Sequence, residues 1–391
     1  MAEFRNENGI LTIALSGHID SGNAAAVEAE VMQIVNGEKY DALVIDAETL
    51  SYISSAGLRI ILRLRKLNPG LRIINVSSEV YEIFDMTGFT EMITIEKAYR
   101  RFSVDGCEVI GQGANGKVYR LDADTIIKVY FNPEALPEIH RERELARKAF
   151  VLGIPTAIPY DVAKVGDGYG SVFELLSAKS FSKLIAAEPE NLEKYVDLYV
   201  ELLQKIHSTE VKPGDMPDMK AVALDWAGFM KDHLPAELAD KLYALVEAVP
   251  ERHTMIHGDY HTKNIMMQNG ETLLIDMDTL SYGHPIFELA SMYLGFVAFG
   301  ESDHSITERF MGLPYETTTK IWKMALKKYL GTDDDAAVDA VEAKAQIIGY
   351  TRLMRRTIRR NGLNTEEGQK TIAVCREKLY DLIPRTDSLD F

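Results

Sequence analysis

The residues best suited to chemistry lie in the sequence HGDYHTKN, from His257 to Asn264. This segment places a carboxylate, Asp259, five positions before the amide of Asn264. Two apolar segments joined by an Asn-Gly pair follow, which predicts a tight β-hairpin that returns Asp276 to the side of Asn264. Such a set suits Mg²⁺-dependent phosphoryl transfer. Asp259 would orient an acceptor hydroxyl and take its proton, while Asn264 and Asp276 would hold Mg²⁺ against a triphosphate.

A glycine-rich segment lies upstream of this set. The sequence GQGANGKV contains Gly111, Gly113 and Gly116 in a G-x-G-x-x-G pattern, with strands expected on both sides. Glycine lets the backbone approach phosphate oxygens and direct its N–H groups at them. The pattern therefore indicates a phosphate-binding loop, and a plain hairpin turn is the alternative interpretation.

Lys128 stands in an otherwise apolar strand, TIIKVYF, where a buried ammonium needs a partner. The helix that follows offers Glu142 and Glu144, of which only one can face the strand. We favour Glu142 as the partner of Lys128. The alternative is that both carboxylates are solvated and Lys128 extends to the surface.

The pattern of elements divides the chain into two domains. The first hundred residues alternate short strands and helices, as in a compact α/β unit. Near Tyr99 the pattern changes to hairpins and then mostly to helices, and the segment between the two patterns has no Gly or Pro run. We predict domains at 1–97 and 104–391, the second with a small lobe at about 104–178 and a large helical lobe at about 179–391.

From about Val104 onward, the sequence resembles the aminoglycoside phosphotransferase and choline kinase-like branch of the protein-kinase-like fold. The resemblance implies an α+β bilobal domain that uses ATP and Mg²⁺, with the glycine loop, lysine and glutamate in the small lobe. The matching residues are Gly111, Gly113, Gly116, Lys128, Glu142, Asp259, His261, Asn264, Asp276 and Asp278. The sequence departs from the family at Thr262 and Lys263, where Pro and Gly are usual, and at Glu288, where Asp is usual.

The phosphate acceptor is not identified by these residues. About ten residues separate Asp276 from the helix expected near Phe287, too few for a long activation segment that docks a peptide. This favours a small acceptor, or a protein acceptor bound in another way. A late helix carries five arginines, which either hold an anionic acceptor or form a solvated, ion-paired face. They are Arg352, Arg355, Arg356, Arg359 and Arg360.

Ser54 and Ser55 stand where a strand turns into a helix, a position at which serine caps the helix. Residues 1–97 also resemble the STAS domain of anti-anti-sigma factors, through GHIDSGNA, LVIDAETLSYISSAGLR and EIFDMTGF. In that family a serine two residues before a Gly-Leu pair is phosphorylated to release a partner, and Ser55 matches this position. The resemblance implies an anti-sigma factor or another protein as partner, although Ser54 replaces the Asp that often precedes the serine.

Composition excludes several classes of partner. The chain has 59 Asp and Glu against 43 Lys and Arg, a net charge of −16, so we expect neither a nucleic-acid nor a membrane partner. The most apolar run, from Met292 to Gly300, is far shorter than the roughly 20 residues of a membrane helix, and we expect a buried helix there. Two cysteines and the lack of a secretory pattern indicate a cytoplasmic protein.

Together these features predict an α/β protein in which a STAS-like domain precedes a kinase-like domain. The predicted activity is ATP- and Mg²⁺-dependent phosphoryl transfer to an unidentified hydroxyl acceptor, a small molecule or a protein, coupled to a signalling module switched at Ser55. The alternative is a non-catalytic, nucleotide-sensing anti-sigma factor antagonist that acts by protein–protein binding. An antibiotic-modifying enzyme is less expected, because detoxification needs no protein-partner switch.

Overall fold

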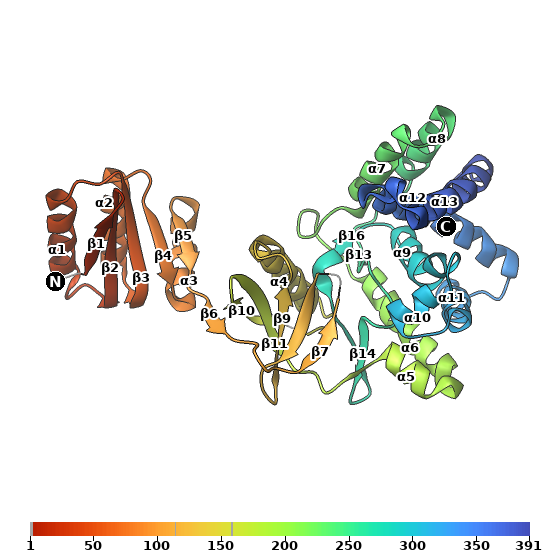
Figure 1. Cartoon of the computed structure of the whole chain (residues 1–391), viewed down its shortest axis with the longest axis horizontal. Coiled ribbons are helices and arrows are strands. Elements are labelled where there is room, and N and C mark those ends of the chain that lie inside the picture. The colour runs from red at the N-terminus through yellow and green to blue at the C-terminus, as the bar shows by residue number, and fades with distance from the viewer. Residues whose placement is uncertain (1–2, 114, 158) are drawn as a thin grey trace. The chain divides into compact units, whose positions relative to one another are not determined.

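The computed structural model describes residues 3–113, 115–157 and 159–391, and its contacts divide the chain into two units. The first unit comprises Met1–Asp105 with Val162–Tyr169, and the second comprises Gly106–Asp161 with Gly170–Phe391. Figure 1 labels elements of both units where there is room. No helix of the described residues is both long and apolar enough to cross a bilayer.

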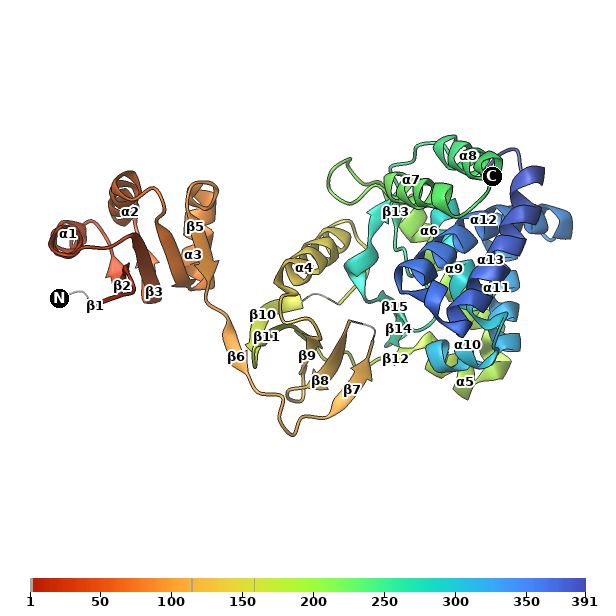
Figure 2. The same cartoon turned by 45° about the horizontal axis from the view of Figure 1, so that its top comes forward.

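The first unit is built around a five-stranded sheet of order β1-β2-β3-β4-β5. β1 and β2 are antiparallel, and the remaining neighbours are parallel. Three helices pack on the sheet (Figures 1 and 2). The core between the helices and the sheet consists mostly of buried Leu, Ile and Val side chains. The elements are β1 (Phe4–Glu7), β2 (Ile10–Ile19), α1 (Ala24–Gly37), β3 (Ala42–Ile53), α2 (Ser55–Leu67), β4 (Arg72–Val76), α3 (Ser78–Met86), η1 (Phe89–Glu91) and β5 (Thr94–Lys97).

Gly57 explains how the start of α2 is held close to this sheet. A Cβ atom at Gly57 would lie 2.6 Å from Cγ1 of Ile53 and 2.9 Å from Cγ2 of Ile19, too near for any other residue. The first turn of α2 therefore rests directly on β2 and β3, and this contact fixes the place of Ser55 in that turn.

A second sheet has the order β6-β10-β11-β9-β8-β7. The pairs β7–β8, β8–β9 and β9–β11 are antiparallel, whereas β6 and β10 are parallel to each other. The helix α4 follows β9 in the chain. The bounds are β6 (Arg100–Phe102), β7 (Val109–Gln112), β8 (Gly116–Arg120), β9 (Thr125–Tyr130), α4 (Leu136–Val151), β10 (Pro159–Val165) and β11 (Gly168–Glu174).

The rest of the second unit is mostly helical, with two small sheets, β12-β14-β15 and β13-β16. Its helices are α5 (Phe181–Ala187), α6 (Leu192–Ser208), α7 (Met219–Phe229), α8 (Ala236–Glu247), α9 (Ile286–Phe296), α10 (Ser305–Met311), α11 (Tyr315–Leu330), α12 (Asp335–Arg359) and α13 (Glu366–Arg385). Its short 3-10 segments are η2 (Pro189–Asn191), η3 (Met230–Asp232), η4 (Met277–Thr279), η5 (Ala298–Gly300) and η6 (Gly362–Asn364). Its strands are β12 (Lys179–Ser180), β13 (Met255–Ile256), β14 (Ile265–Gln268), β15 (Glu271–Leu274) and β16 (Ser281–Tyr282).

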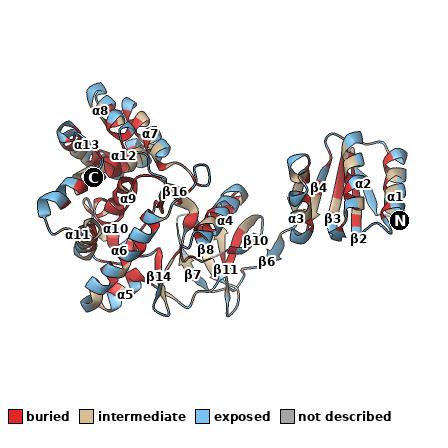
Figure 3. Cartoon of the chain, turned by 180° about the vertical axis from the view of Figure 1, so that it is seen from behind, coloured by how far each residue is buried: buried red, intermediate tan, exposed pale blue. Residues whose placement is uncertain are grey.

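The helix α9 lies at the centre of this helical core. Every residue of α9 is buried, and the buried faces of its neighbours turn inward in Figure 3. The apolar run that begins at Met292 is thus a buried helix, as its length predicted. Because α9 packs against α12, polar side chains of both helices are held in fixed places behind the loop that carries Asp259.

Candidate active site

Lys128 on β9 forms the centre of a cluster of charged side chains. Its Nζ lies 2.9 and 3.1 Å from the two carboxylate oxygens of Glu142 and 2.9 Å from Oδ1 of Asp276. Glu142 is only 6% exposed, whereas Glu144 pairs with Arg147 on the outer face of α4. Burial alone would lower the pKa of Lys128, but the two carboxylates outweigh it and raise that pKa. Lys128 is therefore a fixed cation between the two lobes.

The glycine loop, residues 111–116, connects β7 and β8. A Cβ atom at Gly116 would lie 2.4 Å from the carbonyl oxygen of Val129, so glycine is required there by the neighbouring strand. At Gly113 a Cβ atom would meet nothing within 4 Å, so this stretch of backbone has open space beside it. Ala114 lies outside the described residues. The Asn115 side chain lies 3.4 Å from Oδ2 of Asp278, so the loop reaches the opposite lobe.

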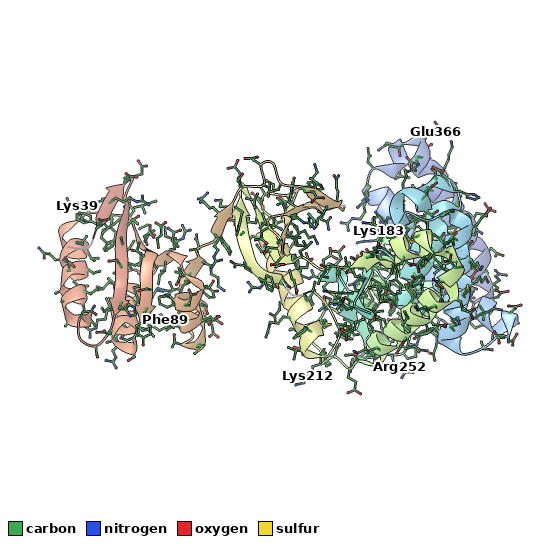
Figure 4. All side chains as sticks on the ribbon, turned by 90° about the horizontal axis from the view of Figure 1, so that it is seen from below. Lys39, Phe89, Lys183, Lys212, Arg252 and Glu366 are labelled. Carbon is green, nitrogen blue, oxygen red and sulfur yellow. The ribbon has the colours of Figure 1, made fainter. Side chains whose placement is uncertain are left out.

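A cavity of about 410 Å³ lies between the glycine loop and the start of α4. Its lining includes Asn115, Tyr130, Glu142 and Asp278. This volume is in the range of small-ligand sites. A larger cavity, about 810 Å³, lies at the C-terminal end of α4 and is lined in part by Lys212 and Arg252, which are labelled in Figure 4. None of the candidate catalytic residues lines the larger cavity, so the smaller one is the better candidate for nucleotide phosphates.

Asn264 and Asp259 are directly linked. Nδ2 of Asn264 donates to the backbone oxygen of Asp259 at 3.0 Å and lies 3.4 Å from its Oδ2. This arrangement leaves the amide oxygen of Asn264 available to a cation. Burial alone would raise the pKa of Asp259, but the hydrogen bond from His261 and nearby positive charge hold that pKa well below its usual value. Asp259 is therefore an anion at neutral pH.

The hairpin β14–β15 brings Asp276 to this pair. Asn269 and Gly270 both have positive φ, 52° and 87°, as a two-residue hairpin turn requires. The strands pair in register, and the N–H of Ile275 donates to the carbonyl oxygen of Asn264 at 2.9 Å. The backbone of Asp276 adopts the left-handed conformation, with φ 64°. The hairpin predicted from the sequence is thus present and carries Asp276 toward Asn264.

The oxygen donors around Asp276 fit a magnesium ion. Burial, and then the charge of Asp276, raise the pKa of Asp278 to about 7, which reflects negative charge that a cation would offset. No group of three or more His, Cys, Asp or Glu side chains among the described residues forms a complete metal site. Mg²⁺ bound with a nucleotide needs only one or two carboxylates beside the phosphate oxygens. Asp276 would supply one such carboxylate, and the amide oxygen of Asn264 would be a further oxygen ligand.

In the first unit, two adjacent serines have different surroundings. Ser54 is the N-cap of α2, and its side chain accepts a hydrogen bond from the N–H of Ala56 at 3.2 Å. Ser55 is the first residue of the helix and is exposed. The capping role assigned to serine at this place thus belongs to Ser54.

Comparison with known proteins assigns both parts of the chain. The pattern of the family described as "Phosphotransferase enzyme family" matches residues 106–311. The chain belongs to this family. The STAS domain matches residues 1–101. A curated relative, the putative anti-sigma factor antagonist BtrV of Bordetella bronchiseptica, is 36% identical over 93 residues, which are 22% of this chain and 78% of that protein.

Solved structures similar to this phosphotransferase share little sequence with it. A thermostable mutant of aminoglycoside phosphotransferase APH(4)-Ia is 12% identical, with a TM-score of 0.49, over 71% of this chain and 94% of the other. A choline/ethanolamine kinase family protein from Mesorhizobium loti is 13% identical, with a TM-score of 0.46, over 72% of this chain and 88% of the other.

Glu288 of the phosphotransferase is a residue whose role the sequence did not reveal. It is fully buried on α9 and accepts hydrogen bonds from the backbone N–H groups of His257, at 2.5 Å, and Gly258, at 3.0 Å. Gly258 has φ 83°, and a Cβ atom there would lie 2.8 Å from the carbonyl oxygen of Thr279. Glu288 thus fixes the backbone immediately before Asp259. Its signals in the sequence were a carboxylate in a very apolar helix and its place at a position where the resembled family usually has Asp.

Two further residues of the phosphotransferase form hydrogen bonds that hold parts of the site in place. Tyr130, two positions after Lys128, donates to Oε2 of Glu142 at 2.5 Å and so orients this carboxylate. Arg352 on α12 donates to the carbonyl oxygen of Gly258 at 3.1 Å, and its charge helps to keep Asp259 ionised. Arg355 instead pairs with Asp225. The five arginines of the late helix therefore do not share one role.

Proposed function

We propose that this chain transfers the γ-phosphoryl group of ATP to the hydroxyl of an acceptor in an Mg²⁺-dependent reaction. The observation that carries the proposal is the position of Lys128, bonded to both Glu142 and Asp276 while Asp259 lies beside Asn264. Phosphoryl transfer depends mainly on positioning and electrostatic stabilisation, for which fixed charges of this kind are suited.

Each residue has one task in the proposed reaction. Lys128 holds phosphate oxygens of ATP, and the backbone of the glycine loop approaches them through the open space at Gly113. Asn264 and Asp276 would hold Mg²⁺, which neutralises charge on the phosphates when it is bound. Asp259 orients the acceptor hydroxyl. As the new oxygen–phosphorus bond forms, the bond to ADP breaks and the hydroxyl proton passes to Asp259.

The STAS domain adds a signalling module, which we propose is switched by phosphorylation of Ser55. Two features support this: Ser55 is exposed in the first turn of α2, and Ser54 alone supplies the cap. A phosphate adds about −1.5 to −2 charges, which the N-terminus of the helix tolerates but an acidic or apolar partner surface does not. The proposed partner is an anti-sigma factor or a protein with a similar docking surface.

The test of the catalytic proposal is the rate of ADP formation from ATP and Mg²⁺. Wild type should form ADP, with water as acceptor when no other is present, and Asp259→Asn should lose the activity. Asp240→Asn is the matched control. It removes the same charge, and Asp240 is an exposed residue of α8. Equal rates for wild type and Asp259→Asn would contradict the assignment. Nucleotide binding without turnover in wild type would favour the non-catalytic sensor.

A further inference from the structure

A row of arginines borders the catalytic loop on the side of α12. Arg352 and Arg356 are one helical turn apart, and Arg360 caps the helix one turn further, so the three share a face. The Arg352 guanidinium lies 5.3 Å from the ring centre of Trp226, and that of Arg356 lies 5.7 Å from the ring centre of Phe299. The row thus extends from the backbone of the catalytic loop to the solvent.

Aromatic side chains connect this row to Asp259. Nε2 of His261 lies 3.4 Å from Oδ2 of Asp259, and the ring of His261 meets that of Phe310 edge-on at 4.9 Å. Phe310 in turn contacts Phe299, the ring under Arg356, at 5.7 Å. An unbroken series of contacts therefore leads from the proposed reaction centre to Arg356, and Asp259 and Arg356 interact electrostatically.

Among the described residues, the outer arginines of the row form no ion pair with a carboxylate. Arg355 on the adjacent face is paired with Asp225, but no ion pair joins Arg356 or Arg360 to an acidic side chain within the described residues. Burial, and then repulsion by Arg360 and Arg352, lower the pKa of Arg356. In a chain of net charge −16, acidic side chains are abundant, yet among the described residues none lies within ion-pair distance of Arg356 or Arg360. An anion from solution would stabilise the row.

Cationic acceptors suit this surface poorly. Choline-like cations bind on the open faces of aromatic rings, but Arg356 already lies over Phe299, and Nζ of Lys263 lies 5.8 Å from the ring centre of Phe310. A polycationic acceptor would meet the like charges of Arg356, Arg360 and Lys263. A peptide acceptor has little to dock on, because α9 begins at Ile286, soon after Asp276.

We propose that the acceptor of this phosphotransferase is a small hydroxyl compound that carries a carboxylate or phosphate group. Arg356 and Arg360 bind the anionic group, and the hydroxyl then lies at Asp259. Guanidinium groups bind both kinds of anion through paired N–H donors. This inference rests on the proposed phosphotransferase function and specifies its substrate class.

The test compares acceptors of similar size and different charge in the ADP-release assay. Glycerol is the neutral compound, glycerate and glycerol 3-phosphate carry the two anionic groups, and choline is the cation. We expect one or both anionic compounds to raise the rate at least tenfold above transfer to water. Arg356→Gln should raise KM for the responding anion at least tenfold, while Arg359→Gln, which removes the same charge one turn away, should change it less than twofold. Preferred phosphorylation of choline or glycerol would overturn the inference.

If no compound of this panel is an acceptor, a measurement of anion binding still tests the inferred anion site. With ADP and Mg²⁺ saturating the nucleotide site, calorimetry with inorganic phosphate and with malonate should detect saturable binding of at least one anion. That binding should weaken at least tenfold in Arg356→Gln and persist in Arg359→Gln. If neither anion binds, or if Arg356→Gln leaves the affinity for the anion unchanged, the inference is wrong.

Failure of the inference differs from failure of the proposed function. Slow Mg²⁺-dependent transfer to water, lost in Asp276→Ala, needs no acceptor and tests the function alone. Loss of anion binding with that reaction intact would reject only the substrate class. Absence of the reaction in wild type would reject the function itself.

Discussion

Lys128 and Asp276 lie 2.9 Å apart although 148 positions separate them in the sequence. One comes from a strand of the small lobe, and the other follows the hairpin of the helical lobe. Lys128 also contacts Glu142, so a single ammonium connects both carboxylates. The charges proposed to bind phosphate are thus arranged before a nucleotide arrives.

The first prediction concerns this ammonium. Lys128→Met should reduce ATP turnover at least 100-fold, because the cation that would hold the phosphates is lost. It also leaves the buried Glu142 without its cation, so we expect the free energy of unfolding to fall by about 1–3 kcal/mol. Steady-state kinetics and urea denaturation measure the two effects. Turnover close to that of wild type would contradict the role given to Lys128.

The second prediction separates the two acidic residues of the site. Asp276→Ala should abolish Mg²⁺-dependent nucleotide binding, because Asp276 is assigned to the metal. Asp259→Asn should keep nucleotide binding within about threefold and lose transfer, since its role begins when the acceptor hydroxyl must be oriented. Calorimetry with a non-hydrolysable ATP analogue, with and without Mg²⁺, distinguishes them. The same binding loss in both variants would show that the two roles are not separate.

The third prediction concerns the anchor of the catalytic loop. Glu288→Ala leaves the N–H groups of His257 and Gly258 buried without acceptors, at a cost of about 1–3 kcal/mol each. We expect the protein to be less stable by about 2–5 kcal/mol and its turnover to fall with nucleotide affinity nearly unchanged. Glu288→Gln keeps one acceptor oxygen and should be intermediate in both measurements. If Glu288→Ala turned over ATP normally, Glu288 would have no positioning role.

Ser55 gives the fourth prediction. Ser55→Asp should leave the first unit folded, because a negative charge at a helix N-terminus is favourable by about 0.3–1 kcal/mol. The same charge should weaken the docking of an anti-sigma partner, whereas Ser55→Ala should not. Circular dichroism checks the fold, and binding curves for one purified partner compare the two variants. Equal affinity in both would leave Ser55 as an ordinary residue of the first turn.

The sequence predicted those parts of the site that depend on local signals. The turn at Asn269 and Gly270 is encoded by two adjacent residues, and the hairpin that it closes brings Ile275, the neighbour of Asp276, into a hydrogen bond with Asn264. Glu288 and Arg352 could not be predicted in this way. They reach the catalytic loop from α9 and α12, and their positions depend on how these helices pack in three dimensions. Local patterns in the sequence indicate elements and turns. Which distant side chains hydrogen-bond to the backbone of a loop depends on tertiary packing.

The last prediction follows from the charge of Asp278. Its pKa is raised to about 7 by burial first and by Asp276 next, against about 3.9 in an unfolded chain. A carboxyl group with a raised pKa contributes stability that is fully present below pH 4 and is lost as the pH rises through 7. Because Asp278 is partly exposed, we expect a loss of only about 1–2 kcal/mol across this range.

Asp278→Asn removes this loss, since an amide does not ionise. The variant without nucleotide should therefore be more stable than wild type at pH 8, by about 1–2 kcal/mol, and nearly equal to it at pH 4. Urea denaturation at both pH values, without Mg²⁺, measures the difference. Asp303→Asn is a suitable control, because the pKa of the exposed Asp303 is lowered rather than raised. If the free energy of unfolding of wild type instead rose relative to that of Asp278→Asn with increasing pH, Asp278 would be stabilised as an anion. Lys128 alone would then balance the negative charges of Asp276 and Asp278.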